Sequence, residues 1–155
     1  SLVVYFKGLS TQTLSRFGPH RFDLSTLMYL YDAADDHLGF LLKQDDSIIG
    51  YSVVRRGYLN HDSERLTQYG LELSGVTDCT FAPSIADSHQ GQGLGKKMFD
   101  TIKDQLVALG FKRVILWGGV QADNFLAVAY YKKLGFQVLG QFEYHGTNYD
   151  MILDL

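Results

Sequence analysis

The sequence has little of several features that each mark a particular class of protein. It contains one cysteine, Cys79, and two prolines among 155 residues. A single cysteine excludes an internal disulfide framework and fits a reducing compartment. No apolar run approaches the roughly 20 residues that span a bilayer, and the first ten residues lack the basic flank and apolar length of a secretory signal. We therefore expect a cytoplasmic protein with no membrane attachment.

Positive charge is also scarce. Lysine and arginine total 14 against 17 acidic residues, so the formal net charge is −3. No cluster of Lys and Arg is dense enough to follow a phosphate backbone, which argues against nucleic acid as a partner. The histidines show no metal-ligand spacing, so we expect no metal site. They are His20, His37, His61, His89 and His145.

Apolar residues are abundant enough for one hydrophobic core. Hydrophobic residues make up 46% of the chain and aromatic residues 14%. A chain of this length buries about 68–70% of its surface on folding, so it needs no disulfide or metal to be stable. We find no internal repeat, linker or compositional shift, and expect a single domain over residues 1–155.

Hydrophobic periodicity and turn residues predict alternating helices and strands. Four-residue spacing of apolar residues from Leu94 predicts an amphipathic helix that ends at Gly110. Asp123 or Asn124 caps another helix, which Gly135 ends. Further helices are expected over Thr11–Phe17 and Asp23–Ala34, and Asn60–Glu64 reads as a polar loop. The expected strands are Ser1–Phe6, His37–Leu42, Ile48–Val54, Leu71–Phe81, Phe111–Trp117, Phe136–Leu139 and Tyr149–Leu153. This order predicts an α/β domain with a mixed sheet.

A glycine-rich turn joins an expected strand to the helix from Leu94. Gly91, Gly93 and Gly95 remove side chains where a backbone can approach a ligand closely. The helix start offers unpaired N–H groups and the positive end of its dipole, and Lys96 and Lys97 add positive charge. The pattern predicts an anion site. It lacks the Lys-Ser/Thr of a P-loop and the spacing of a dinucleotide fingerprint. The alternative is a flexible loop before an ordinary helix.

A second motif follows the glycine-rich turn at a characteristic distance. Together the two motifs resemble the GNAT superfamily of acetyl-CoA-dependent N-acetyltransferases. They read Gln90-x-x-Gly93-x-Gly95 and Asn124-x-x-Ala127-x-x-x-Tyr131-x-Lys133-x-Gly135-Phe136. The resemblance implies a mostly antiparallel central sheet of about six or seven strands, split at two parallel strands and flanked by about four helices. The parallel strands would be Leu71–Phe81 and Phe111–Trp117.

The resemblance also implies acetyl-CoA as co-substrate and an N-acetyltransferase that acts on the primary amine of a small molecule or of a peptide or protein. The alternative is a non-catalytic acyl-CoA-binding or sensor domain. Whether the chain is a monomer or a homodimer is left open. The implied cofactor-binding residues are Cys79, Thr80, Phe81, Gln90, Gly91, Gln92, Gly93, Leu94, Gly95, Lys96, Asn124 and Tyr131.

Catalysis in this family needs an acid and a base. Tyr131 matches the family's general-acid tyrosine, although a core aromatic is the plainer interpretation and Tyr130 lies beside it. For the base we expect Asp78 or Glu72, which an unbulged strand would place on one face, or a water molecule that relays the proton. Cys79 is expected to be a small buried strand residue rather than a nucleophile.

Overall fold

The computed structural model describes all residues, 1–155. Its α-helices are α1 (Leu2–Lys7), α2 (Thr11–Arg16), α3 (Leu24–Met28), α4 (Asn60–Gln68), α5 (Leu94–Ala108) and α6 (Phe125–Leu134). A π-helical turn, η1 (Tyr29–Ala33), continues α3, and a 3₁₀ turn, η2 (Asp87–His89), precedes α5. The strands are β1 (His37–Gln44), β2 (Ser47–Arg56), β3 (Asp78–Ile85), β4 (Arg113–Leu116), β5 (Val120–Gln121), β6 (Gln137–Glu143) and β7 (Thr147–Asp154).

The seven strands form one mixed sheet in the order β1-β2-β3-β4-β7-β5, with β6 paired to β7. Strands β3 and β4 run parallel, and β7 pairs antiparallel with β4, β5 and β6. The predicted α/β class and the mostly antiparallel sheet with one parallel pair are therefore confirmed. The expectation of about four helices was too low, because α1 and α4 were not foreseen.

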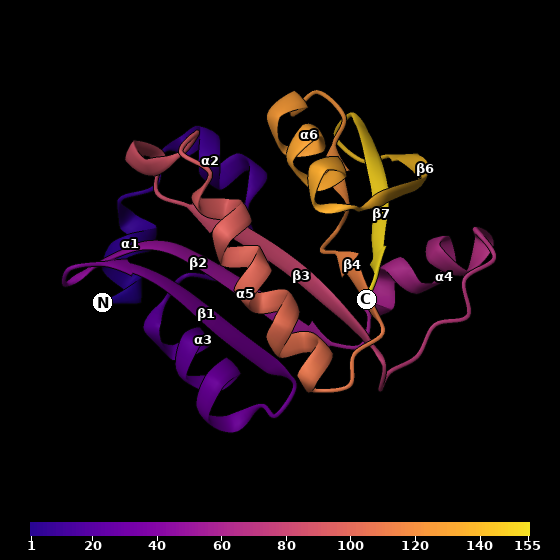
Figure 1. Ribbon diagram of the computed structural model, residues 1–155, viewed down its shortest axis with the longest axis horizontal. Coiled ribbons are helices and arrows are strands. Elements are labelled where there is room, and N and C mark those ends of the chain that lie inside the picture. The colour runs from indigo at the N-terminus through magenta and orange to yellow at the C-terminus, as the bar shows by residue number, and fades with distance from the viewer. The chain divides into compact units, whose positions relative to one another are not determined.

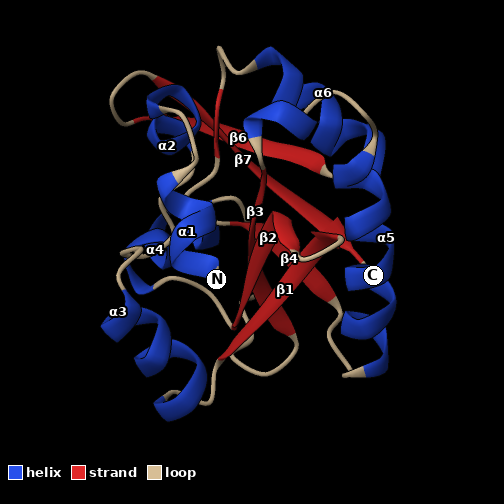
Figure 2. Cartoon of the chain, turned by 90° about the vertical axis from the view of Figure 1, so that its left-hand side faces the viewer, coloured by secondary structure: helices blue, strands red, loops and turns tan.

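Two compact units divide the chain. The first unit is Ser1–Val54 with Ala82–Ile102, and the second is Arg55–Phe81 with Lys103–Leu155. In the first unit, α1–α3 lie on one side of the β1–β2 hairpin and α5 lies on the other (Figure 2). Neighbouring residues of β2 face these two layers alternately. The Tyr51 ring meets Phe6 of α1 at 5.1 Å, whereas a Cβ added at Gly50 would meet Met98 of α5.

The prediction of a strand at Ser1–Phe6 was wrong, because this segment forms α1. Valines and aromatic residues favour strands, and they dominate the segment. Tertiary packing decides otherwise: Tyr5, Phe6 and Leu9 are buried while Val4 is 66% exposed. Burial at positions i, i+1 and i+4 is the pattern of one helix face rather than of an alternating strand.

In the second unit, α6 lies beside the β6–β7 hairpin (Figure 1). The buried core of this unit includes Leu66 of α4, Ile115 of β4 and Ile152 of β7. Helix α4 replaces the polar loop predicted at Asn60–Glu64. Its one buried apolar residue is Leu66, so the sequence shows no apolar stripe.

An ion-pair network fixes α4 instead. Arg65 donates to Asp150 of β7 at 2.6 and 3.0 Å and to Asp62 at 2.9 Å, and its guanidinium lies 3.7 Å from the centre of the Phe142 ring. Asp62 and Asp150 are both buried. Burying these carboxylates is tolerated because Arg65 satisfies them.

Most of the predicted strand Leu71–Phe81 is loop, since β3 begins only at Asp78. Leu71 and Leu73 pack on the core of the second unit from the preceding loop. Their alternation with polar residues is the pattern of a strand, which is why the sequence predicted one here. The other predicted strand of the parallel pair, Phe111–Trp117, is confirmed in its central residues, Arg113–Leu116.

Candidate active site

The glycine-rich turn lies in the first unit between η2 and the start of α5. Gly91 and Gly93 have φ angles of +74° and +75°, which glycine adopts without the strain that other residues incur. A Cβ added at either position would meet nothing within 4 Å. Backbone conformation, rather than crowding, therefore requires glycine here, and the space beside both residues is open to a ligand.

Helix α5 supplies the positive end of its dipole to this turn. The first N–H groups of a helix have no partner inside it, and Lys97 N bonds back to Gly93 O at 3.3 Å. Gly95 is the second residue of the helix. The Lys96 and Lys97 side chains are exposed, and Lys96 Nζ pairs with Asp100 at 2.7 Å. An anion at this helix end would gain about 0.3–1 kcal/mol from each dipole or charge contact.

The residues before the glycines are held by neighbouring elements. Gln90 Nε2 donates to Ile85 O at 3.0 Å and to Thr13 Oγ1 at 3.3 Å. His89 Nε2 lies 2.9 Å from Gln44 Oε1. Gln92 Nε2 reaches Ser88 O at 3.4 Å. These contacts attach the turn to α2 and to the end of β1.

Cys79, Thr80 and Phe81 lie in the paired part of β3 in the second unit, and all three are buried. Thr80 Oγ1 donates to Gly57 O at 2.8 Å, and Phe81 O accepts from Trp117 N at 3.0 Å. The pairing with β4 ends at Phe81–Leu116. The structure therefore encloses these side chains in the sheet, and a ligand could use only backbone groups near Phe81.

The Cys79 thiol is unsuited to nucleophilic attack. It is fully buried, and burial together with the nearby Asp78 charge raises its pKa to about 12. The thiolate is the reactive form, so its population at neutral pH is very small. This environment agrees with the interpretation of Cys79 as a structural residue.

Helix α6 carries the second motif. Asn124 caps it, with Oδ1 accepting from Ala127 N at 3.4 Å, and Gly135 ends it with a φ of +101°. Both features were predicted. Tyr131 packs edge-on against Phe136 with 5.5 Å between ring centres, and Tyr130 lies 5.1 Å away. Burial, with a smaller effect of Tyr130, raises the pKa of the Tyr131 phenol, so the hydroxyl is protonated at neutral pH.

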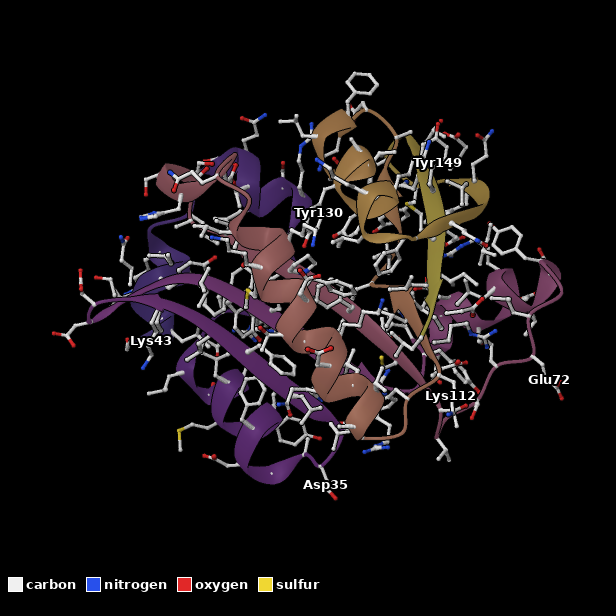
Figure 3. The ribbon with its side chains drawn as sticks, in the orientation of Figure 1. Asp35, Lys43, Glu72, Lys112, Tyr130 and Tyr149 are labelled. Atoms are coloured by element: carbon white, nitrogen blue, oxygen red, sulfur yellow. The ribbon has the colours of Figure 1, made fainter.

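The two carboxylates considered as bases lie in different environments. Asp78 is buried and accepts from Arg113 Nε and Nη2 at 2.9 and 2.8 Å and from Ser74 N at 2.9 Å. Glu72 is exposed and points outward from the loop before β3 (Figure 3). The expectation that both lie on one strand face was wrong, because β3 does not reach Glu72.

Sequence reasoning missed the contacts that hold the site residues in place. Arg113 was read only as part of an apolar strand, and Ser10, Thr13 and Asp87 were given no role. Asp87 bonds to Ser10 across 77 positions of sequence. No local pattern reports such a contact. The polar spacing of Ser10 and Thr13 at the start of a helix was the only available signal.

No group of three or more His, Cys, Asp or Glu side chains is arranged to hold a metal ion. None of the helices combines the length and the apolar character that crossing a bilayer requires.

Comparisons with known proteins agree on one family. The sequence profile described as "Acetyltransferase (GNAT) family" matches residues 7–136. No curated protein matches the chain. Among solved structures, the GNAT domain of S. lividans PAT has a TM-score of 0.73 and 17% sequence identity, covering 99% of this chain and 83% of that one.

Two other similar structures contain a cofactor. The aminoglycoside acetyltransferase AAC(6')-Ib in complex with coenzyme A has a TM-score of 0.69 and 17% identity, over 97% of this chain and 87% of that one. The putative acetyltransferase yncA from Salmonella typhimurium, with acetyl-CoA, has a TM-score of 0.59 and 19% identity, over 77% and 65%. At these identities the likeness concerns the fold.

Proposed function

Because the chain belongs to the GNAT acetyltransferase family, we propose that it transfers the acetyl group of acetyl-CoA to a primary amine by direct attack. The observation that carries this proposal is the pair of left-handed glycines, Gly91 and Gly93, open on one side and followed by the start of α5. This arrangement fits a diphosphate, the anionic part of acetyl-CoA. Similar structures contain coenzyme A and acetyl-CoA, which supports the same co-substrate here.

The diphosphate would be held by the segment from Gln90 to Lys96. Backbone N–H groups of Gly91, Gln92, Gly93, Leu94 and Gly95 would donate to phosphate oxygens, and Lys96 would add a charge contact. Hydrogen bonds to charged groups contribute about 1.5–3 kcal/mol each at best. Asn124 would contact the pantetheine arm, as the motif implies. Of the three β3 residues, we propose backbone contact for Phe81, as the resemblance implies, while burial confines the Cys79 and Thr80 side chains to the sheet.

The reaction forms an N–C bond at the acetyl carbonyl and breaks the C–S bond of the thioester. The attacking amine must be neutral, and at a pKa near 10.4 only about one in 2,500 molecules is neutral at pH 7, which costs about 4.6 kcal/mol. A base must take the proton from the nitrogen. We assign this step to water, because both oxygens of Asp78 accept hydrogen bonds and Glu72 points away from the loop.

Tyr131 is the proposed donor to the departing thiolate. The phenol is protonated at neutral pH because burial raises its pKa, so its hydrogen bond to sulfur is available throughout. A coenzyme A thiol has a pKa near 8.5, so complete proton transfer from the phenol is uphill. Tyr131 therefore stabilises the leaving thiolate mainly as a hydrogen-bond donor, and the final proton comes from the pool released by the amine.

Both carboxylate oxygens of Asp78 already accept hydrogen bonds from Arg113. A second function is therefore also tested, that of a domain that binds acyl-CoA without turnover. An inactive relative would keep the glycine loop and lack a usable base. The acceptor of an active enzyme would be a small-molecule or peptide amine. The aminoglycoside acetyltransferase among the similar structures supports including aminoglycosides in the panel.

Two measurements test the proposal. Acetyl-CoA should raise the midpoint of thermal unfolding, since a ligand that binds only the native state stabilises it. Release of free thiol should then depend on an added amine from a panel of polyamines, aminoglycosides and lysine peptides. Binding without amine-dependent thiol release supports the non-catalytic function. Absence of any midpoint shift at millimolar acetyl-CoA contradicts both.

A further inference from the structure

Side-chain hydrogen bonds join the first turn of α2 to the segment before the glycine loop. Asp87 Oδ2 accepts from Ser10 N at 3.0 Å. Asp87 Oδ1 accepts from Ser10 Oγ at 2.5 Å and from Thr13 Oγ1 at 2.8 Å. We call Ser10, Thr13 and Asp87 the α2 clamp. All of these contacts lie within the first unit.

The α2 clamp holds both ends of η2. Ser10 is the N-cap of α2 and Thr13 lies three residues further, so both side chains are at the same end of the helix. Asp87 begins η2, and Gln90, which follows it, donates to the same Thr13 hydroxyl. Gly91 comes next in the chain. The backbone that enters the left-handed glycines is therefore fixed to α2 at two points.

The contacts of Asp87 are matched in charge and direction. Its partners in the α2 clamp are all donors, and a carboxylate accepts through both oxygens. Hydrogen bonds to an ionised acceptor are roughly twice as strong as neutral ones. The Ser10 hydroxyl and amide, with Thr13, hold the pKa of Asp87 below its usual value. The carboxylate is ionised at neutral pH.

We propose that Asp87 is a positioning residue for the diphosphate of acetyl-CoA, acting through the α2 clamp on Gly91 and Gly93. Glycine loses more conformational freedom on ordering than other residues, so a loop ordered in advance binds its ligand with a smaller entropy loss. The inference rests on the proposed function for the identity of the ligand. Ordering of the loop by Asp87 does not depend on it.

Because Asp87 is negatively charged, the direction in which its removal changes Kd distinguishes two explanations. A negative charge this close in sequence to an anion site repels the diphosphate. If the α2 clamp had no role, removing the charge would tighten acetyl-CoA binding. If the α2 clamp orders the loop, removing the charge weakens binding. The two explanations predict opposite changes in Kd.

The test measures Kd and KM for acetyl-CoA, and kcat, in Asp87→Ala and Asp87→Asn. We expect Asp87→Ala to raise Kd and KM about fivefold or more and to leave kcat at saturating acetyl-CoA within about twofold. Asp87→Asn keeps one acceptor, for the Ser10 amide, and should fall between wild type and Asp87→Ala. Ser10→Ala as a single substitution should also raise Kd. Combined with Asp87→Ala, it should raise Kd little further, because the two residues contact each other. An unchanged or lower Kd in Asp87→Ala overturns the inference.

Asp23→Ala is the matched control. Asp23 caps α3 in the same unit and accepts from Ser25 Oγ at 2.6 Å and from Thr26 N at 2.9 Å. Its network has the same chemistry but does not touch the glycine loop. This variant should lose a comparable amount of stability while its Kd for acetyl-CoA stays within about twofold of wild type. A Kd increase equal to that of Asp87→Ala would show a general effect of destabilisation and overturn the inference.

Amide hydrogen exchange without any ligand separates this inference from the proposed function. Amides in residues 87–96 should exchange faster in Asp87→Ala than in wild type and should not change in Asp23→Ala. Equal exchange in Asp87→Ala and wild type overturns the role of the α2 clamp, whatever the protein binds. Failure of the wild type to bind acetyl-CoA overturns the proposed function and leaves the exchange comparison intact.

Discussion

Asp78 and Arg113 are directly paired residues of the parallel strands β3 and β4, and their side chains form a two-point ion pair. The Asp78 side chain is 3% exposed and that of Arg113 is 16% exposed. Arg113 also donates to Glu72 O at 2.8 Å, so one guanidinium fixes the start of β3 and the loop before it. This position gives Asp78 a structural task in the second unit.

Asp78→Asn should therefore affect stability more than turnover. Breaking a buried ion pair leaves an uncompensated charge, and the free energy of unfolding should fall by about 3 kcal/mol. Denaturant unfolding measures the loss, and kcat per folded molecule should be nearly unchanged. Arg113→Lys should show a smaller stability loss, because lysine keeps the positive charge beside Asp78 and loses only the two-point contact. A fall in kcat of about 100-fold per folded molecule would return the base role to Asp78.

Gly93→Ala should weaken acetyl-CoA binding by about tenfold or more. An alanine at a φ of +75° is strained by about 1–2 kcal/mol, and its Cβ would occupy the open space beside the loop. Calorimetry of acetyl-CoA binding measures the effect. Gly70→Ala is the control, since Gly70 has a φ of +86° and equally open surroundings outside the motif. Equal Kd values in the two variants would contradict the proposed diphosphate site.

Tyr131→Phe should lower kcat by about 100-fold and leave Kd for acetyl-CoA nearly unchanged. The variant keeps the ring that packs on Phe136 and loses only the hydroxyl that faces the thiolate in the proposed reaction. Steady-state thiol release and calorimetry measure the two quantities. Tyr130→Phe serves as the control and should keep most of the wild-type kcat. The reverse result would transfer the role to Tyr130.

His20 should make the stability of the first unit depend on pH. Its Nε2 lies 2.6 Å from the buried Tyr51 hydroxyl, and burial lowers the pKa of His20 below 6.5. Below pH 6.5 the unfolded chain gains a proton that folded His20 still resists, so stability falls as the pH drops toward the folded pKa. Denaturant unfolding from pH 8 to pH 5 should show this loss.

His20→Gln is the control for that titration. Glutamine keeps a polar partner for Tyr51 and does not titrate, so the variant should have a flatter stability profile between pH 7 and pH 5. Parallel profiles for wild type and His20→Gln would contradict this assignment.

The helices of the second half of the chain could be predicted because their sequence signals are local. Gly110, Gly135 and Asn124 end or cap helices by their own conformations, and the structure has each in the expected place. The apolar stripe that begins at Leu94 likewise needs only neighbours within α5. Short-range rules describe such elements well.

Predictions for the first half of the chain were wrong where contacts between residues far apart in sequence decide the secondary structure. Tyr5 looks like a strand residue until its hydroxyl meets Ser84, 79 positions away, at 2.9 Å. Helix α4 has no apolar stripe and depends on the Arg65–Asp150 pair across 85 positions. Arg113 likewise pairs with Asp78 across 35 positions, a contact that no local pattern reports. Tertiary contacts of this kind override local propensity.

Arg65 and Leu66 of helix α4 contact the rest of the second unit. The other face of α4 carries Glu64, Thr67 and Gln68, which are exposed. A cysteine introduced at Glu64 would therefore accept a maleimide dye while native Cys79 stays shielded. The polar helix thus offers an attachment point for one fluorescent dye at a known position in the second unit.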